Sequence, residues 1–442
     1  MKKLLLFLNL LFLFAACDVL DVQPLSSIPA SEAFKDKAGV ERGILGAYSA
    51  FQGLSYYGRT YGIFSDLAAD NLVHPPNATA AEYNEVDNNS ILPENGSVDG
   101  IWTSLYEGIN IANNVIAQVP GVPGMSTAER NAALGELYFI RALNHFNLTN
   151  YFGAIPLKTS PTIGVDKVDA PRDNVDAVYA QIIADLRFAT EHLPASRSRK
   201  IRASKQAAHA LLARVYLYHK DYQNAIASAT EVLNNGGYTL LTNYADIFAS
   251  DESAESVFEI DFTVLIRNRI AEYNFPLSLN GRREVAPTTE LLSKYVAADA
   301  RLATTIAYTG TTPYVIKYDD LSTGSDNVIV LRLAEMYLIR AEARARLGGD
   351  VPLIQADINA IRSRARLATV TATAYADLLL SIEAERRLEF AFEGQRWFDL
   401  VRTGRAVDVL ATVTNENQTL FPIPLSEILA NRSPGMRQNP GY

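Results

Sequence analysis

A tight helical hairpin near the middle of the chain constrains the fold more than any other feature. Segments 204–219 and 222–234 carry apolar residues at helical spacing on both sides of the short turn Lys220-Asp221-Tyr222. With Ala213 set as a small position of a tetratricopeptide repeat, the later contact positions of that repeat fall on Tyr216, Ala225, Ala229 and Val232. Those positions lie where the two helices of a repeat cross closely. The pattern therefore predicts a repeat-type helical hairpin.

Three further pairs of helical segments follow the same plan with weaker matches to the repeat. They span 127–151 with 174–192, 327–347 with 352–366, and 374–392 with 395–410. Hairpins of this kind stack side by side and bury one continuous core between them. The sequence therefore predicts an all-α dominated, tetratricopeptide-like scaffold of about four hairpins.

The N-terminal third combines two helical segments with a long irregular one. Segment 31–51, with Ser31 as its expected cap, and segment 101–119 are amphipathic. Between them, 55–100 lacks a clear period and is rich in Asn, Asp, Pro, Gly and Tyr. A long irregular stretch inside a compact protein is usually functional or mobile.

A second interruption separates the later hairpins. Segment 238–326 contains strand-like pieces at 256–262 and 314–317, the first with a two-residue alternation. The Pro- and Asn-rich tail 420–442 is too apolar to be a free end. We therefore expect inserted loops and short strands beside the helices.

The first residues are typical of an export signal. Lys2 and Lys3 precede an almost unbroken apolar run over 4–16, which suits a signal peptide and is shorter than the about 20 residues of a membrane-spanning helix. The run ends in Phe14-Ala15-Ala16-Cys17, which resembles a bacterial lipobox except that Leu is usual in place of Phe14. Cys17 is the single cysteine, so no intrachain disulfide can form. We expect Cys17 to carry a lipid.

Composition and missing motifs exclude several classes of function. The net charge of −9 disfavours a nucleic-acid partner. The chain has no phosphate-binding glycine-rich loop, no His-Glu-x-x-His pair and no Gly-x-Ser-x-Gly elbow, and its five histidines are dispersed. We therefore expect no cofactor, no metal site and no catalytic activity.

Four elements, in order along the chain, resemble the SusD/RagB family of nutrient-binding outer-membrane lipoproteins of Bacteroidota. They are CDVLDVQP from Cys17, GELYFIRALNHFNLTNYFGAIPL over 135–157, AERRLEFAFEGQRWFDLVRTG over 384–404 and LFPIPLSEILANRSPGMRQNPGY over 420–442. The last two are the most specific. All four elements together span the whole chain after the signal segment.

The third of these elements is interpreted as structural. Its charged residues lie three or four positions apart, so they are expected to pair along helix faces: Glu385, Arg386, Glu389, Glu393 and Arg396. Trp397 and Phe398 are expected to anchor the core. A pair of catalytic carboxylates would need a controlled separation and a shifted pKa, and the sequence shows neither.

The resemblance implies a lipoprotein on the outer face of the outer membrane. It would capture an oligosaccharide and deliver it to a SusC-like TonB-dependent transporter. The chain then divides into a signal peptide over 1–16, a lipidated tether over 17–30 and one SusD-like domain over 31–442, with an N-terminal part about 31–235 and a C-terminal part about 255–442. Three alternatives remain: the same architecture binding peptides, a helical-repeat scaffold that binds only protein, and a surface hydrolase.

Ligands in this family are held mainly by loops outside the repeats, which correspond here to 55–100 and 261–283. The candidate contacts are Tyr56, Tyr57, Arg59, Tyr61, Asn71, Tyr83 and Asn84 in the first loop, and Arg267, Arg269, Tyr273 and Asn280 in the second. A glycan needs flat aromatic faces and polar side chains, whereas a peptide needs backbone-pairing groups in a deeper cleft. Trp102 and Trp397 fall on helices and are not expected as platforms.

Overall fold

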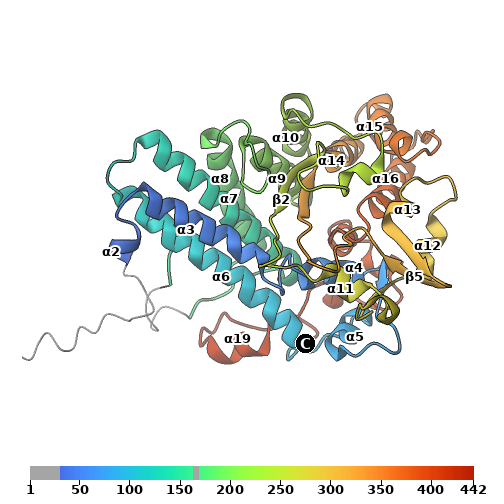
Figure 1. The fold of residues 1–442 in the computed structure, drawn as a ribbon, viewed down its shortest axis with the longest axis horizontal. Coiled ribbons are helices and arrows are strands. Elements are labelled where there is room, and N and C mark those ends of the chain that lie inside the picture. The colour runs from blue at the N-terminus through green and yellow to red at the C-terminus, as the bar shows by residue number, and fades with distance from the viewer. Residues whose placement is uncertain (1–29, 163–168) are drawn as a thin grey trace, which may run out of the picture.

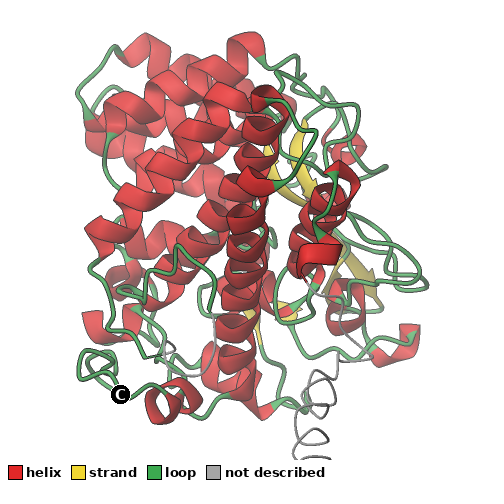
Figure 2. Ribbon diagram, turned by 90° about the vertical axis from the view of Figure 1, so that its left-hand side faces the viewer, coloured by secondary structure: helices red, strands yellow, loops and turns green. Residues whose placement is uncertain are grey.

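The protein is described by a computed structural model over residues 30–162 and 169–442 (Figure 1). Long helices make up most of the molecule, and the short strands lie on one side of it (Figure 2). The predicted all-α dominated architecture is therefore confirmed. The predicted signal peptide and Cys17 lie outside the described residues. Within the described ranges, none of the helices combines the length and the apolar character needed to cross a bilayer.

Three of the predicted hairpins form the scaffold. They are α7 (Thr127–Phe152) with α8 (Val175–His192), α9 (Lys205–Tyr218) with α10 (Tyr222–Asn235), and α14 (Leu333–Arg346) with α15 (Val351–Arg364). Ala213, Ala225 and Ala229 are fully buried, as expected for close helix crossings. Helix α10 also packs against α14, so the second and third hairpins stack although about a hundred residues separate them.

The predicted fourth hairpin is wrong in its second half. Segment 395–410 forms two short helices, α17 (Arg396–Arg402) and α18 (Ala406–Val409), because Gly404 between them has φ +72°, which glycine adopts at little cost. Helix α16 (Tyr375–Glu389) packs mainly on α14 and α15. Helix α17 packs instead on α4 (Thr60–Leu67), so it links the C-terminal region to the first irregular loop.

The N-terminal helices differ from prediction at their starts. Segment 31–51 divides into α2 (Ala30–Ala33), α3 (Lys37–Ser49) and a 3₁₀ helix (Ala50–Gln52). The cap of α3 is Asp36 rather than Ser31, because the Asp36 carboxylate accepts a hydrogen bond from the Gly39 amide at 2.8 Å.

Helix α6 (Gly96–Gln118) begins five residues before the predicted position 101. The side chain of Asn95 accepts hydrogen bonds from the amides of Ser97 and Val98 and so fixes this earlier start. Helices α3, α6 and α7 pack side by side (Figure 1).

The strands form small antiparallel pairs. Among the described residues these are β1 (Leu72–Val73) with β3 (Ala286–Pro287), β2 (Ser256–Ile260) with β6 (Val328–Arg332), and β4 (Ile306–Thr309) with β5 (Thr312–Val315). The predicted strands at 256–262 and 314–317 correspond to β2 and β5. The helix expected to start at 327 is wrong over 328–332, because the Val-Ile-Val-Leu run favours a strand and pairs with β2.

Short elements occupy the segments between the hairpins. They are α5 (Ala81–Asp87), α11 (Ile270–Asn274), α12 (Thr289–Lys294), α13 (Leu302–Thr305), α19 (Leu425–Ala430) and 3₁₀ helices at Val119–Gly121, Tyr244–Ile247, Leu277–Leu279 and Glu416–Thr419. Segment 55–100 is therefore not irregular throughout, since it holds α4, β1 and α5. The tail is integrated as expected: Phe421 and Ile423 are fully buried in the main core.

The charged C-terminal motif pairs across the fold instead of along its own helix. Glu385 contacts Arg301 at 2.6 Å, and Arg386 contacts Asp399 at 2.7 Å. The predicted pairing along helix faces is wrong, because the helix is buried and neighbouring elements supply the partners. Trp397 and Phe398 are buried core residues, as predicted.

Candidate ligand-binding site

The two loops expected to hold a ligand meet in space. The amide of Arg269 donates to the carbonyl of Gly58 at 2.8 Å, and β1 of the first loop pairs with β3 just after the second. Helices α4, α5 and α11 consequently lie together on the lower right of the molecule (Figure 1). One surface, and not two, therefore carries the predicted loops.

Tyr273 on α11 lies at the centre of this surface. The guanidinium carbons of Arg59, Arg282 and Arg269 lie 4.4, 5.0 and 5.8 Å from its ring centroid. The ring centroid of Tyr83 is 5.6 Å away, and Arg59 Nη1 donates to Tyr273 Oη at 2.7 Å. We call these five residues the arginine–tyrosine cluster. The Tyr273 side chain is covered by its neighbours, at 7% exposure, so the groups presented to solvent are guanidiniums.

Two carboxylates hold part of the cluster in place. Glu272 pairs with Arg269, and this hydrogen bond lowers the pKa of Glu272 and raises that of Arg269. Glu284 pairs with Arg282 at 3.1 Å and accepts hydrogen bonds from the Thr79 hydroxyl and the amides of Thr79 and Ala80. Burial alone would raise the pKa of Glu284, but these donors outweigh it and lower the pKa. The second loop is thereby fastened to the first.

Four of the predicted contact residues are packed inside the protein. Tyr56 and Tyr57 stack at 4.5 Å, and both hydroxyls accept hydrogen bonds from Asn147. Tyr61 is buried against Tyr151, whose hydroxyl donates to the Tyr61 carbonyl at 2.7 Å. Asn71 is fully buried and donates to Asp66 at 2.7 Å. We place Tyr56, Tyr57, Tyr61 and Asn71 among the packing residues, because none presents a free face to solvent.

The other predicted residues belong to the arginine–tyrosine cluster or lie at the surface. Arg59, Tyr83, Arg269 and Tyr273 are members of the cluster, in which both tyrosines are buried. Arg267 is exposed and donates to the Leu321 carbonyl at 3.2 Å. Asn84 and Asn280 are exposed, the first on α5 and the second at the end of the 3₁₀ helix after α11.

The structure adds residues that were not singled out from the sequence. Phe275 and Tyr314 are half-buried, and their ring centroids lie 4.9 Å apart. Arg283 is next to them, since its Nη1 donates to the Pro313 carbonyl at 3.0 Å. The only signal for Phe275, Arg282 and Arg283 was their place in the 261–283 loop, and Tyr314 was interpreted only as part of a strand.

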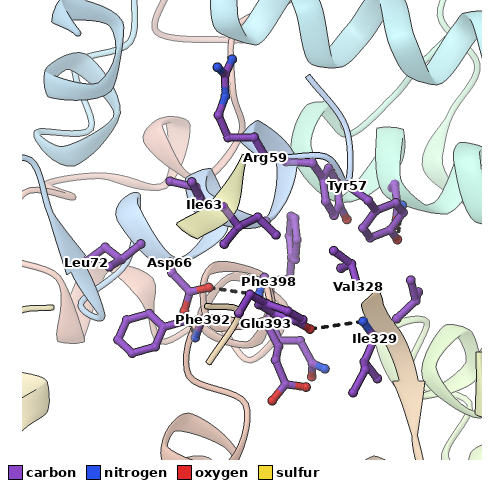
Figure 3. Close-up of a pocket in the computed structure, with 18 of the residues that line it drawn as sticks. Tyr57, Arg59, Ile63, Asp66, Leu72, Val328, Ile329, Phe392, Glu393 and Phe398 are labelled. Atoms are coloured by element: carbon purple, nitrogen blue, oxygen red, sulfur yellow. Dashed lines mark hydrogen bonds between the residues drawn. The ribbon is translucent and has the colours of Figure 1, made fainter. Parts of the chain in front are cut away.

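A small cavity is lined by residues of the first predicted loop and of neighbouring elements (Figure 3). Tyr57, Tyr61 and Asp66 are among its lining residues, and its volume is about 50 Å³. A cavity of this size holds a few water molecules, whereas small-molecule sites usually reach about 300–1,000 Å³. Burial raises the pKa of Asp66 to about 6 although the amides of Phe392 and Gly394 and the side chain of Asn71 donate to it. We therefore interpret the cavity as a gap in the packing and not as a ligand site.

A more open groove runs along α6. It has a volume of about 460 Å³, and Trp102, Tyr106, Asn110 and Asn113 line it together with part of segment 158–162. Trp102 is buried, with Tyr106 and Phe152 rings 4.9 and 5.0 Å from it, so it offers no free face. This agrees with the expectation that Trp102 is not a platform. Among residues 30–162 and 169–442, no three His, Cys, Asp or Glu side chains are placed to hold a metal ion.

Comparison with known proteins decides the family. A SusD-like family described as "Starch-binding associating with outer membrane" matches residues 18–217, and the SusD family matches residues 313–413. The chain belongs to the SusD/RagB family. SusD-like protein P2 of Formosa agariphila is 28% identical over 500 residues, covering 99% of both chains. A SusD-like protein of Bacteroides ovatus is 27% identical and covers 70% of this chain and 66% of its own.

Solved structures support the same assignment. A laminarin-binding SusD-like protein superposes with a TM-score of 0.83 at 27% identity, over 92% of this chain and all of the other. A SusD superfamily protein of Bacteroides vulgatus has a TM-score of 0.84 at 22% identity, which shows the shared fold. SusD-family proteins have a helical, tetratricopeptide-like fold and are non-catalytic proteins associated with the cell surface. The predicted family, fold class and non-catalytic role are therefore confirmed.

Proposed function

We propose that this protein captures a glycan at the cell surface and delivers it to a SusC-like TonB-dependent outer-membrane transporter. The observation that carries the proposal is the joining of both predicted loops into one surface with donor-rich side chains and a half-exposed aromatic pair, Phe275 and Tyr314. Ring faces suit sugar C–H groups, and guanidiniums donate to sugar oxygens. The names of relatives that bind starch or laminarin support the same ligand class.

The surface favours a glycan over a peptide. A peptide site needs a deeper cleft with backbone pairing, and the cavity beside the first loop has a volume of only about 50 Å³. Peptide binding nevertheless remains the second candidate, because arginines also bind peptide carboxylates.

Calorimetry against a panel of oligosaccharides and peptides tests the ligand class. We expect saccharide binding that weakens about 10-fold, or ~1.4 kcal/mol, in Phe275→Ala and in Tyr314→Ala. Tyr106→Ala is the matched control, since Tyr106 is a half-buried aromatic of the α6 groove. Loss of binding only in Tyr106→Ala would move the site to that groove, and binding of peptides alone would replace the glycan proposal.

The transporter partner is tested separately. Affinity purification of this protein from its own membranes should bring down a TonB-dependent barrel protein. A protein-only scaffold predicts the same copurification with no saccharide or peptide binding in calorimetry. Absence of any barrel protein from the purified complex would contradict delivery to a transporter.

The lipid anchor is also part of the proposal. Cys17→Ala should release the protein from the membrane fraction with unchanged circular dichroism, because the acyl chains supply the membrane affinity at about 0.8 kcal/mol per buried CH₂. Full retention of the Cys17→Ala variant in membranes would refute the anchor.

A further inference from the structure

Five arginines converge on the two ligand loops of an otherwise acidic protein. The chain has a net charge of −9, yet Arg59 of the first loop lies together with Arg269 and Arg282 of the second, and the second loop also carries Arg267 and Arg283. Three of the five guanidiniums surround one tyrosine ring within 5.8 Å of its centroid. Such a concentration of like charge needs a physical reason, because neighbouring cations repel one another.

Carboxylates within the loops form ion pairs with only two of these five arginines. Glu272 pairs with Arg269, and Glu284 pairs with Arg282. The hydrogen bonds of the other three end on uncharged oxygens: Arg59 on the hydroxyls of Tyr273 and Thr60, Arg267 on the Leu321 carbonyl, and Arg283 on the Pro313 carbonyl. Donors of these guanidiniums therefore have no carboxylate partner among the described ion pairs.

Nearby acidic groups are engaged elsewhere. Asp320, in the loop that Arg267 contacts, accepts hydrogen bonds from Thr323 and Ser325 of its own turn. Asp326 accepts from the side chain of Asn268. Neither carboxylate forms an ion pair with these arginines among the described contacts.

The arginine side chains are also reachable. Those of Arg282 and Arg269 are 43% and 35% exposed, and Arg267 lies at the surface. The aromatic pair Phe275 and Tyr314 adjoins them through Arg283. An extended ligand lying across this surface would therefore contact both aromatic rings and guanidinium groups.

We infer that the glycan bound here is anionic, with carboxylate or sulfate groups that the loop arginines receive. This inference rests on the proposed glycan-binding function and narrows its ligand class. Guanidinium forks match the planar oxygens of a uronate and also the oxygens of a sulfate ester. A neutral glucan such as laminarin offers only hydroxyls and has no anionic group to pair with these arginines.

Matched pairs of oligosaccharides test the inference. Isothermal calorimetry would compare oligogalacturonate with its carboxyl-reduced form, and a sulfated galactan oligosaccharide with its desulfated form. We expect one charged member to bind at least about 10-fold more tightly than its neutral match, with affinity falling as salt rises from about 20 to about 200 mM. The pair that shows the difference identifies the anion as carboxylate or sulfate.

Arginine variants locate the effect. Arg267→Gln and Arg282→Gln should each lower the affinity for the charged glycan about 5- to 10-fold and reduce its salt dependence. Arg42→Gln is the control, because Arg42 is an exposed arginine on α3, outside both loops. Circular dichroism confirms that each variant is folded, and unchanged affinity in both loop variants overturns the inference.

The outcomes separate this inference from the proposed function. Equal binding of charged and neutral oligosaccharides, without salt dependence, overturns the anionic ligand and leaves glycan capture intact. Binding of no oligosaccharide of either kind overturns glycan capture itself. Preferential binding of an acidic peptide in the same assay contradicts both and makes the arginines a peptide-carboxylate site.

Discussion

His145 is a fully buried histidine on α7, and it makes stability depend on pH. Burial, helped by the nearby Arg141 guanidinium, lowers the pKa of His145 to about 3. In the unfolded chain the histidine pKa is about 6.5. Between these values the unfolded chain binds a proton that the folded protein does not, so acidification favours unfolding.

The expected size of this effect can be measured by difference. From pH 7 to pH 5 the wild-type protein should lose about 2 kcal/mol more unfolding free energy than His145→Gln. Urea unfolding at both pH values gives this difference. His192→Gln should behave as the wild type because it leaves His145 in place. Equal losses in the wild type and in His145→Gln would show that another group causes the acid sensitivity.

Single residues also mark the limit of prediction for the site. Arg59 and Tyr273 were both predicted, yet their contact joins positions 214 residues apart and no local pattern encodes it. Tyr56 and Tyr83 are both buried, but Tyr56 packs against Asn147 of α7 whereas Tyr83 packs beside Tyr273 of the second loop. The partners of a particular ring belong to elements that are distant in sequence, so a local pattern could indicate the loops but could not indicate which of their rings are buried.

At the scale of elements, the start of α7 is fixed by a reciprocal cap. The Ser126 hydroxyl accepts a hydrogen bond from the Glu129 amide, and the Glu129 carboxylate accepts one from the Ser126 amide. Thr127, the next residue, also carries a hydroxyl but is already the first residue of the helix. We expect Ser126→Ala to lower the unfolding free energy by about 1 kcal/mol and Thr127→Ala to change it by less than about 0.5 kcal/mol.

Chemical unfolding of the two alanine variants distinguishes the caps. They are a matched pair, since both replace an exposed hydroxyl at adjacent positions. A larger loss in Thr127→Ala than in Ser126→Ala would contradict the cap seen in the structure.

Helices were predictable where a local pattern decides them. Ser204 and Asn174 cap α9 and α8 at the predicted boundaries through hydrogen bonds from Ala207 and Ala177 amides. Segment 328–332 was assigned wrongly because its partner strand, β2, lies about seventy residues earlier. An apolar run of that length fits a buried helix or a strand, and only its pairing decides which one forms.

At the scale of the whole molecule, a buried network of charges joins segments that are far apart. Glu389 of α16 contacts Arg332 at the end of β6, Arg364 at the end of α15 and Arg301 before α13. Glu255 beside β2 contacts Arg332 and Arg364, and all these side chains are buried. Burial alone would raise the pKa of Glu389, but the three guanidiniums outweigh it and hold that pKa well below its usual range.

Removing one charge from this network should therefore cost far more than removing a surface charge. Glu389→Gln keeps the side-chain shape but leaves three buried guanidiniums short of one carboxylate, and we expect a loss of about 3–5 kcal/mol of unfolding free energy at pH 7. The exposed pair of Lys294 and Glu290 is the control, and Lys294→Gln should cost less than about 1 kcal/mol. Urea unfolding measures both variants.

The stabilisation by Glu389 should also depend on pH. Because the carboxylate is ionised in the fold well below the unfolded pKa of about 4.3, its contribution is present above that pH and is lost on further acidification. The gap between wild type and Glu389→Gln should consequently narrow below about pH 4. A Glu389→Gln cost no larger than that of Lys294→Gln would mean that the buried charges do not stabilise the fold together.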